Sequence, residues 1–147
     1  GSEINLRTPA LLPDGYCPDV HERLTLYKRL ANGESTEDID ALQEELIDRF
    51  GELPIQGQSL LATHRLRLLV KPLCIQKVDA TNDQITLQFG PEFVKQAPIE
   101  PIKSIKKNQK NRSYKLAGQD KISLLRHCPT LTDKVAAVKD MIRQLTT

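Results

Sequence analysis

Acidic side chains recur over residues 37–48 at spacings of three and four. In a helix of 3.6 residues per turn, this spacing places carboxylates on the side away from the apolar residues Ile39, Leu46 and Phe50. The set is Glu37, Asp40, Glu44 and Asp48, with Glu45 to one side and Arg49 nearby. Carboxylates without matching bases suit an arginine-rich protein partner, because guanidinium groups form charge-assisted hydrogen bonds with them. An ordinary solvated helix face is the alternative interpretation.

Basic side chains gather in a second stretch, residues 103–115, which contains no acid. The six bases are Lys103, Lys106, Lys107, Lys110, Arg112 and Lys115. Such a stretch favours phosphate contact, since each neutralised phosphate releases counterions. Aromatic residues total only 4% of the chain, so a stacking surface for single-stranded nucleic acid is poorly supported. The preferred interpretation of the stretch is a solvated basic face, and a DNA- or RNA-binding accessory surface is the alternative.

The cysteines and histidines offer little chemistry. Cys17, Cys74 and Cys128 are odd in number and widely spaced, which fits neither a disulfide framework nor a CxxC motif. Buried free thiols are therefore expected. A cysteine enzyme built on Cys128 and His127 is a remote alternative, because adjacent residues on a strand point to opposite faces. Phosphate-binding loops, dinucleotide-binding glycine motifs and metal-ligand spacings are absent, so we expect no catalytic residue, cofactor or metal.

Length and charge set the class of protein. At 147 residues the chain is about one domain long, and its 39% hydrophobic content is ordinary for a globular protein. The net charge is only +2, but Gly1–Glu52 holds twelve acids against five bases, whereas Leu53–Thr147 holds seven acids against sixteen bases. This segregation suggests charged partners. Gly1 and Ser2 are interpreted as a remnant of expression, and a cytoplasmic location is expected because no signal peptide or membrane span is recognised.

The first half of the chain predicts helices. Glu3–Arg7 has the pattern of a short extended segment, and the following prolines exclude a helix up to residue 18. Asp19 is a predicted N-cap, with Glu22 completing a capping box. The apolar face of that first helix is expected at Val20, Leu24, Tyr27 and Ala31. A second helix is predicted from Ser35 or Thr36 to Gly51, with Ile39, Leu42, Leu46 and Phe50 as its apolar stripe, and a third helix from Pro54 to Pro72.

The second half predicts strands and a closing helix. Residues 74–78 and 84–89 form one predicted hairpin and residues 112–116 and 121–125 a second, with a short helical segment beginning near Pro98 between them. A last helix is expected with its N-cap at Thr132 or Asp133 and its buried face at Val135, Val138, Ile142 and Leu145. The predicted fold class is α+β, with a helical first half packed on a small antiparallel sheet of two hairpins and a closing C-terminal helix.

The exact sequence motifs of the first half indicate a specific family, which the pattern of helices and loops alone does not. The run LRTPALLPDGYCPDVHERLTLYKRLANGES, followed by EELIDRFGELP, strongly resembles the C-terminal domain of the bacterial transcription-repair coupling factors. The features that carry the resemblance occur in order. They are the LLP loop, the Pro-Asp helix start, the YKRL helix and the ELIDRFG motif, with Pro54 after it. Beyond about Leu69 the resemblance rests on the order of elements.

The resemblance implies a regulatory fragment of a larger ATP-dependent DNA translocase. The parent factor would remove stalled RNA polymerase from double-stranded DNA and recruit the repair protein UvrA, using ATP and Mg in its motor domains. Residues 3–18 would be an extended linker, and residues 19–147 one regulatory domain that docks on the factor's UvrB-like module and masks its UvrA-binding surface. The implied contact residues are Glu45, Asp48 and Arg49. Nothing in the resemblance extends to Glu44, and the fragment itself is expected not to be an enzyme.

Overall fold

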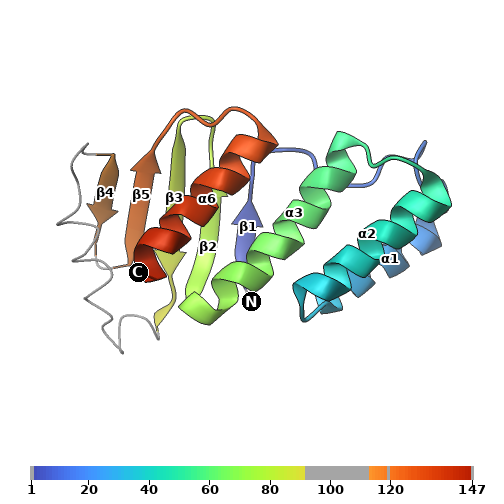
Figure 1. Ribbon diagram of the computed structural model, residues 1–147, viewed down its shortest axis with the longest axis horizontal. Coiled ribbons are helices and arrows are strands. Elements are labelled where there is room, and N and C mark those ends of the chain that lie inside the picture. The colour runs from blue at the N-terminus through green and yellow to red at the C-terminus, as the bar shows by residue number, and fades with distance from the viewer. Residues whose placement is uncertain (1, 92–112, 119, 147) are drawn as a thin grey trace. The chain divides into compact units, whose positions relative to one another are not determined.

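The computed structural model describes residues 2–91, 113–118 and 120–146, and these residues confirm the α+β class. In chain order the elements are β1 (Glu3–Asn5), α1 (Val20–Asn32), α2 (Thr36–Phe50), α3 (Ile55–Val70), η1 (Lys71–Leu73), β2 (Ile75–Ala80), β3 (Gln84–Phe89), β4 (Tyr114–Ala117), β5 (Lys121–Leu125) and α6 (Leu131–Thr146) (Figure 1). They form two compact units. The helical unit is Thr8–Leu69, and the sheet unit is Gly1–Arg7 together with Val70–Thr147.

The helical unit is built on one apolar core. Ser35 is the N-cap of helix α2, and its side chain forms a reciprocal capping box with Asp38. Gly51 is the C-cap, so both ends of the helix lie where the sequence predicts them. Its predicted stripe faces the core, with Ile39, Leu42 and Leu46 buried and Phe50 partly buried. The other buried members of this core are Leu12, Cys17, Leu26, Leu30, Leu60 and Leu61. The loop before α1 is therefore packed into the core, together with all three helices.

The predicted apolar face of α1 is wrong. Its buried residues are Leu26 and Leu30, whereas Val20 and Leu24 are 55% and 53% exposed. Val20 and Leu24 instead line an open groove with Leu11. Tyr27 is partly buried, and its hydroxyl accepts a hydrogen bond from the Leu12 backbone N–H at 2.9 Å. The Asp19 cap is confirmed, since its carboxylate accepts the His21 and Glu22 backbone N–H groups.

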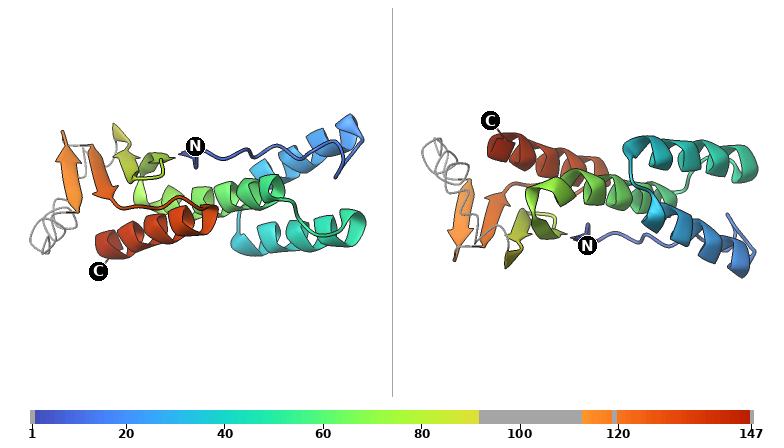
Figure 2. Two further views of the ribbon diagram at one scale, coloured as in Figure 1. Left: turned by 90° about the horizontal axis from the view of Figure 1, so that it is seen from above. Right: turned by 90° about the horizontal axis from the view of Figure 1, so that it is seen from below.

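The sheet is mixed and larger than the two predicted hairpins. Its strand order is β1-β2-β3-β5-β4, in which β1 pairs with β2 in parallel and the remaining pairs are antiparallel. Glu3–Arg7 is the predicted short extended segment, and three of its residues, Glu3–Asn5, form the edge strand β1. Helix α6 lies along one face of the sheet (Figure 2). It buries Ala137, Val138, Met141, Ile142 and Leu145.

The predicted N-cap of α6 at Thr132 or Asp133 is wrong by at least two residues. The side-chain hydroxyl of Thr130 accepts the Asp133 backbone N–H at 3.0 Å, and the Thr130 carbonyl accepts that of Lys134. Thr130 therefore has the bonding of an N-cap, and the helix begins at Leu131. The predicted helical segment near Pro98 lies outside the described residues.

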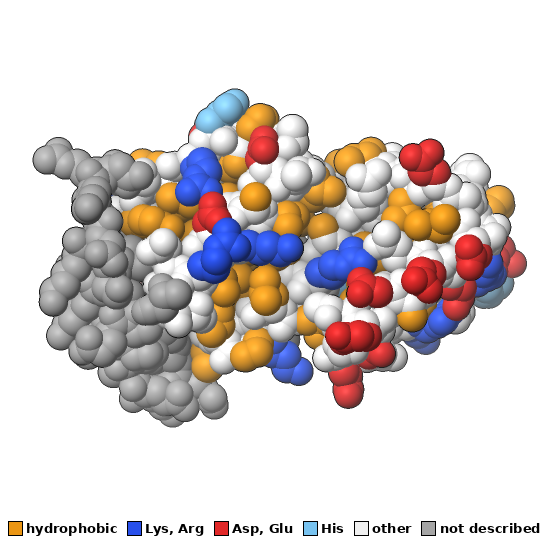
Figure 3. All heavy atoms as spheres, viewed as in Figure 1, with side chains coloured by type: hydrophobic (Ala, Val, Ile, Leu, Met, Phe, Trp, Pro, Cys, Tyr) orange, Lys and Arg blue, Asp and Glu red, His pale blue; other side chains and the backbone are white. Residues whose placement is uncertain are grey.

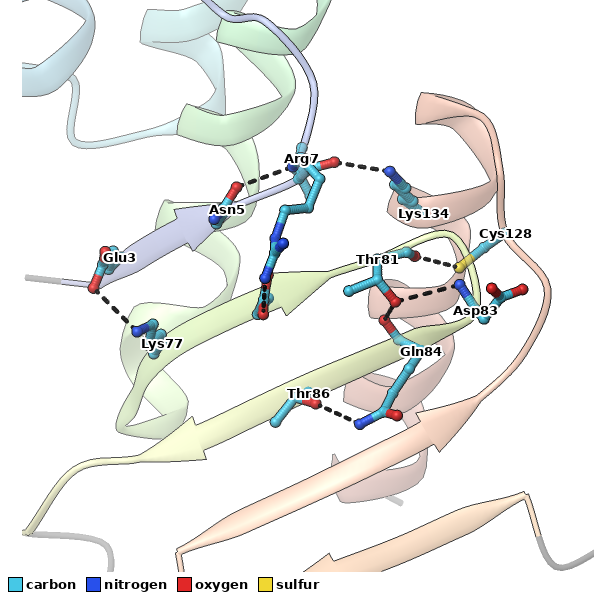
Figure 4. A network of polar contacts seen from close by, with 12 residues as sticks. Glu3, Asn5, Arg7, Lys77, Thr81, Asp83, Gln84, Thr86, Cys128 and Lys134 are labelled. Carbon is cyan, nitrogen blue, oxygen red and sulfur yellow. Dashed lines mark hydrogen bonds and ion pairs between the residues drawn. The ribbon is translucent and has the colours of Figure 1, made fainter.

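A buried lysine fastens the N-terminal segment to the sheet unit. Lys134 is 1% exposed, and its ammonium donates a 3.0 Å hydrogen bond to the carbonyl of Leu6, which is itself buried (Figure 4). Arg7 follows with a left-handed φ of 57° and makes two 2.9 Å hydrogen bonds to the Asp79 carboxylate. The segment is thus held by strand pairing, by the buried contact between Lys134 and Leu6, and by exposed ion pairs of Arg7 with Asp79 and of Glu3 with Lys77.

Candidate protein-interaction site

The outer face of α2 carries the predicted acidic set. Glu37, Asp40, Glu44 and Asp48 are all exposed. Figure 3 shows acidic side chains gathered over the helical unit. Within the described part of the chain, Glu44 and Asp48 have no ion-pair or hydrogen-bond partner on their side chains. These two carboxylates, one turn apart, remain available to cations from another protein.

Glu45 is already paired inside the helical unit. Its carboxylate accepts two hydrogen bonds from Arg29 of α1, at 2.6 and 2.8 Å, and one from Arg49 at 3.1 Å. The hydrogen bond from Arg29 lowers the pKa of Glu45 below its usual range, and the positive charge of Arg29 adds to this. Bidentate geometry orients both side chains, so Glu45 links α1 to α2.

Arg49 extends this link along the same flank of α2. Its guanidinium pairs with Glu22 of α1 as well as with Glu45, and it lies over the ring of Phe50 at 4.8 Å from the centroid. Charges of alternating sign, Glu22, Arg49, Glu45 and Arg29, therefore cross between the two helices. Each pair is partly exposed, so each contributes little stability alone, but the chain of pairs fixes the position of the groups.

The opposite flank of α2 faces α3. Arg65 of α3 donates hydrogen bonds to Asp40 at 2.8 Å and to the side-chain oxygen of Gln43 at 2.6 Å. Next to this contact is a shallow pocket of about 390 Å³. Its lining residues are Gln43, Ile47, Glu52, Leu53, Gln58, Leu61 and Arg65. One flank of α2 is thus closed by ion pairs to α1, while the other opens into a pocket.

The structure separates the three residues that the resemblance implied as contacts. Asp48 is exposed and unpaired within the described residues, whereas Glu45 and Arg49 are engaged with α1. Reasoning from the sequence missed Arg29 as the partner of Glu45 and Glu22 as the partner of Arg49. It also missed Arg65 as the partner of Asp40. The i, i+4 spacing of Glu45 and Arg49 was a signal for one of these contacts, but no local pattern marks the pairs between helices.

Of the predicted basic stretch, residues 103–115, the structure describes only residues 113–115. Lys115 is exposed on β4. Lys103, Lys106, Lys107, Lys110 and Arg112 lie outside the described residues, so nucleic-acid contact at this stretch stays a prediction.

Cys128 and His127 do not form a catalytic pair. The buried Cys128 thiol donates to the Thr81 carbonyl at 3.3 Å, and burial raises the pKa of this thiol. The exposed His127 ring lies 3.1 Å from the Asp83 carboxylate instead. Cys17 is also buried, and Cys74 is partly exposed. A thiol whose pKa is raised and that lacks a neighbouring base is a poor nucleophile.

The described residues contain neither a group of side chains that could hold a metal ion nor a helix that could cross a membrane. No group of three or more histidine, cysteine or acidic side chains there is placed to hold a metal ion. Over the same residues, no helix has both the length and the apolar character needed to cross a membrane.

The pairing of Glu45 predicts a pH-dependent stability. A carboxyl group whose pKa is lowered by folding stabilises the folded state at neutral pH, and this contribution is lost as pH falls through the lowered pKa. We expect Glu45→Gln to reduce the free energy of unfolding by about 0.5–1 kcal/mol at pH 7, since solvent screens this pair. The difference from the unsubstituted chain should begin to shrink near the ordinary glutamate pKa of about 4.3 and should disappear only as pH falls through the lowered pKa of Glu45. Urea unfolding from pH 7 to 3 measures it, and a difference that is constant with pH would contradict the assignment.

Comparisons with known proteins agree on one family. A family model described as the TRCF domain matches residues 6–102. The chain is similar to the transcription-repair-coupling factors of Haemophilus influenzae, at 39% identity, and Escherichia coli, at 32% identity, each over 98% of this chain. It spans 12% of the length of each of these relatives. The fold is similar to the crystal structure of the C-terminal domain of a transcription-repair coupling factor, with a TM-score of 0.79 and 21% identity over 99% of this chain and 91% of that one.

Proposed function

Because this chain belongs to the TRCF domain family of the transcription-repair coupling factors, we propose that it acts as an autoinhibitory domain of such a factor. In this proposal it docks on the UvrB-like module of the same factor, masks the surface used by UvrA, and restrains the ATP-dependent translocase that removes stalled RNA polymerase from DNA. The motor activity, with its ATP and Mg, would belong to the rest of the factor, and this chain would contribute no catalytic group.

The unpaired carboxylates on the outer face of α2 are the observation that supports this proposal best. An exposed acid without a partner is free to receive a guanidinium from another protein, and electrostatic complementarity favours a basic partner over an acidic one. Asp48 combines such a free carboxylate with a position in the ELIDRFG motif. It is therefore the leading contact residue.

Glu45 and Arg49 have a different role in this docking. Both side chains are held by α1, so they would meet the partner in a preformed geometry. Preorganised groups lose less conformational entropy on binding than free ones do. Docking on the module and UvrA binding would then compete for one surface, and a coupling free energy of about 1–3 kcal/mol is enough to regulate the competition.

Calorimetric titration of the chain with the isolated UvrB-like module tests the docking. We expect Asp48→Lys to weaken binding at least tenfold, since it places a positive charge against the basic surface of the partner. Glu37→Lys makes the same charge change on the same helix face but three turns earlier, so it should bind nearly as the unsubstituted chain does. Equal losses in both variants would indicate attraction by net charge alone. Absence of binding by the unsubstituted chain would contradict the proposal.

A second measurement addresses the masking. The module should bind UvrA less tightly when this chain is present in excess, and Asp48→Lys should abolish that difference. If the chain binds the module without changing its affinity for UvrA, docking would be separate from masking.

A further inference from the structure

The pocket beside α2 has an apolar wall that is open to solvent. Ile47 is 41% exposed, and Leu53 and Leu61 also line the pocket. Ile47 lies on the α3 flank of the helix, one turn from Gln43, and is adjacent in sequence to Asp48 of the outer face. A partner that contacts Asp48 is thus within reach of the pocket.

The polar groups at the rim of the pocket are acceptors. The Glu52 carboxylate is exposed and has no ion-pair or hydrogen-bond partner among the residues that the structure describes. The Gln58 amide N–H donates to the Leu53 carbonyl at 3.2 Å, which leaves its side-chain oxygen free to accept. Arg65 is the one cation in the lining, and Asp40 and Gln43 already accept its hydrogen bonds.

An apolar wall next to an unpaired carboxylate favours one kind of side chain in the pocket. Arginine has an apolar stem that covers aliphatic surface and a planar cationic tip that pairs with carboxylates. A purely aliphatic side chain would cover the Glu52 carboxylate without a compensating partner, which costs free energy. An anionic side chain would be repelled by the unpaired carboxylate of Glu52 in the lining. The lining therefore fits a long cation better than either alternative.

We propose that this pocket receives an arginine side chain of the UvrB-like module, with its stem against Ile47 and Leu53 and its guanidinium at Glu52. The proposal rests on the docking described under the proposed function and adds a specific anchor to it. Asp48 and Glu52 would then hold two separate basic groups of the partner. A side chain held in the pocket would restrict the positions that the docked surface can take.

Two small substitutions test the anchor in titrations with the UvrB-like module. Glu52→Gln keeps the size of the side chain and removes its charge, and we expect it to weaken binding about five- to tenfold. Ile47→Ala shortens the apolar wall and should weaken binding about three- to fivefold. The matched controls are Glu34→Gln and Leu24→Ala, which make the same kinds of change at exposed positions outside the pocket. Both controls should bind within about twofold of the unsubstituted chain.

Double-mutant cycles identify the occupant. Each arginine of the module is replaced by alanine in turn, and one of these changes should lose its effect when Glu52 is already glutamine. If Asp48→Lys abolishes binding while Glu52→Gln and Ile47→Ala bind normally, the result contradicts the arginine anchor in the pocket. The same result would still support docking of the chain on the UvrB-like module. If no arginine is coupled to Glu52, the occupant is wrong. If the unsubstituted chain does not bind the module, both proposals fail.

Discussion

Deleting residues 1–7 is expected to lower the free energy of unfolding by about 4 kcal/mol, because it removes a buried leucine and leaves a buried ammonium group without its acceptor. Leu6 is only 3% exposed, and its carbonyl accepts the hydrogen bond from Lys134. The deletion also removes the pairing of β1 with β2. The ion pair of Arg7 with Asp79 adds little, since both side chains are open to solvent. Urea unfolding followed by circular dichroism measures the loss.

The substitution Lys134→Met separates the two causes of this effect. In the shortened chain it removes the unpaired ammonium group but keeps most of the side-chain volume, so it should restore part of the lost stability. In the full chain the same substitution leaves the Leu6 carbonyl without its donor and should be destabilising. A shortened chain that unfolds at the same urea concentration as the full chain would show that the N-terminal segment is not part of the fold in solution.

Ile39→Ala should destabilise the helical unit by about 3 kcal/mol, through lost burial and the cavity that remains. Ile39 is 0% exposed and belongs to the core shared by the pre-helical loop and all three helices. Its terminal methyl lies 3.0 Å from the point where a Cβ on Gly33 would stand, so the Ile39 side chain packs closely against this glycine. The urea midpoint of unfolding reports the loss.

Ile47→Ala is the matched control for this change. It removes the same atoms from the same helix, but at a position that is 41% exposed, and should change stability by less than about 1 kcal/mol. Equal effects at the two positions would contradict the orientation of α2 described above.

The buried face of α2 could be predicted from the sequence, whereas that of α1 could not. In α2 the apolar residues form a single stripe, and Ser35 and Gly51 mark both ends, so local chemistry specifies the helix and its buried face. In α1 the stripe through Val20, Leu24 and Tyr27 competes with one through Leu26 and Leu30 at equivalent spacing. Only the packing partner decides between two such stripes, and that partner is distant in sequence.

The sequence also could not predict which charged side chains of the candidate site are paired. The resemblance pointed to Glu45, Asp48 and Arg49 as contact residues, but it carried no information on which side chains are free. Glu45 is paired with Arg29, sixteen positions away, because α1 and α2 pack at a particular rotation. Helical spacing gives the neighbours of a residue on its own helix only. The difference between a free and a paired carboxylate therefore required the structure.

The parallel pairing of β1 has a consequence for the order of events during synthesis. Glu3 pairs with Lys77, so the edge strand leaves the ribosome long before its partner exists. At about 5–20 residues per second, the delay is roughly 4–15 s. The intervening segment contains three helices with mainly local contacts, which form within about a millisecond. The nascent chain therefore carries a folded helical unit and an unpaired N-terminal strand for seconds, and capture of that strand is a late step in the maturation of the domain.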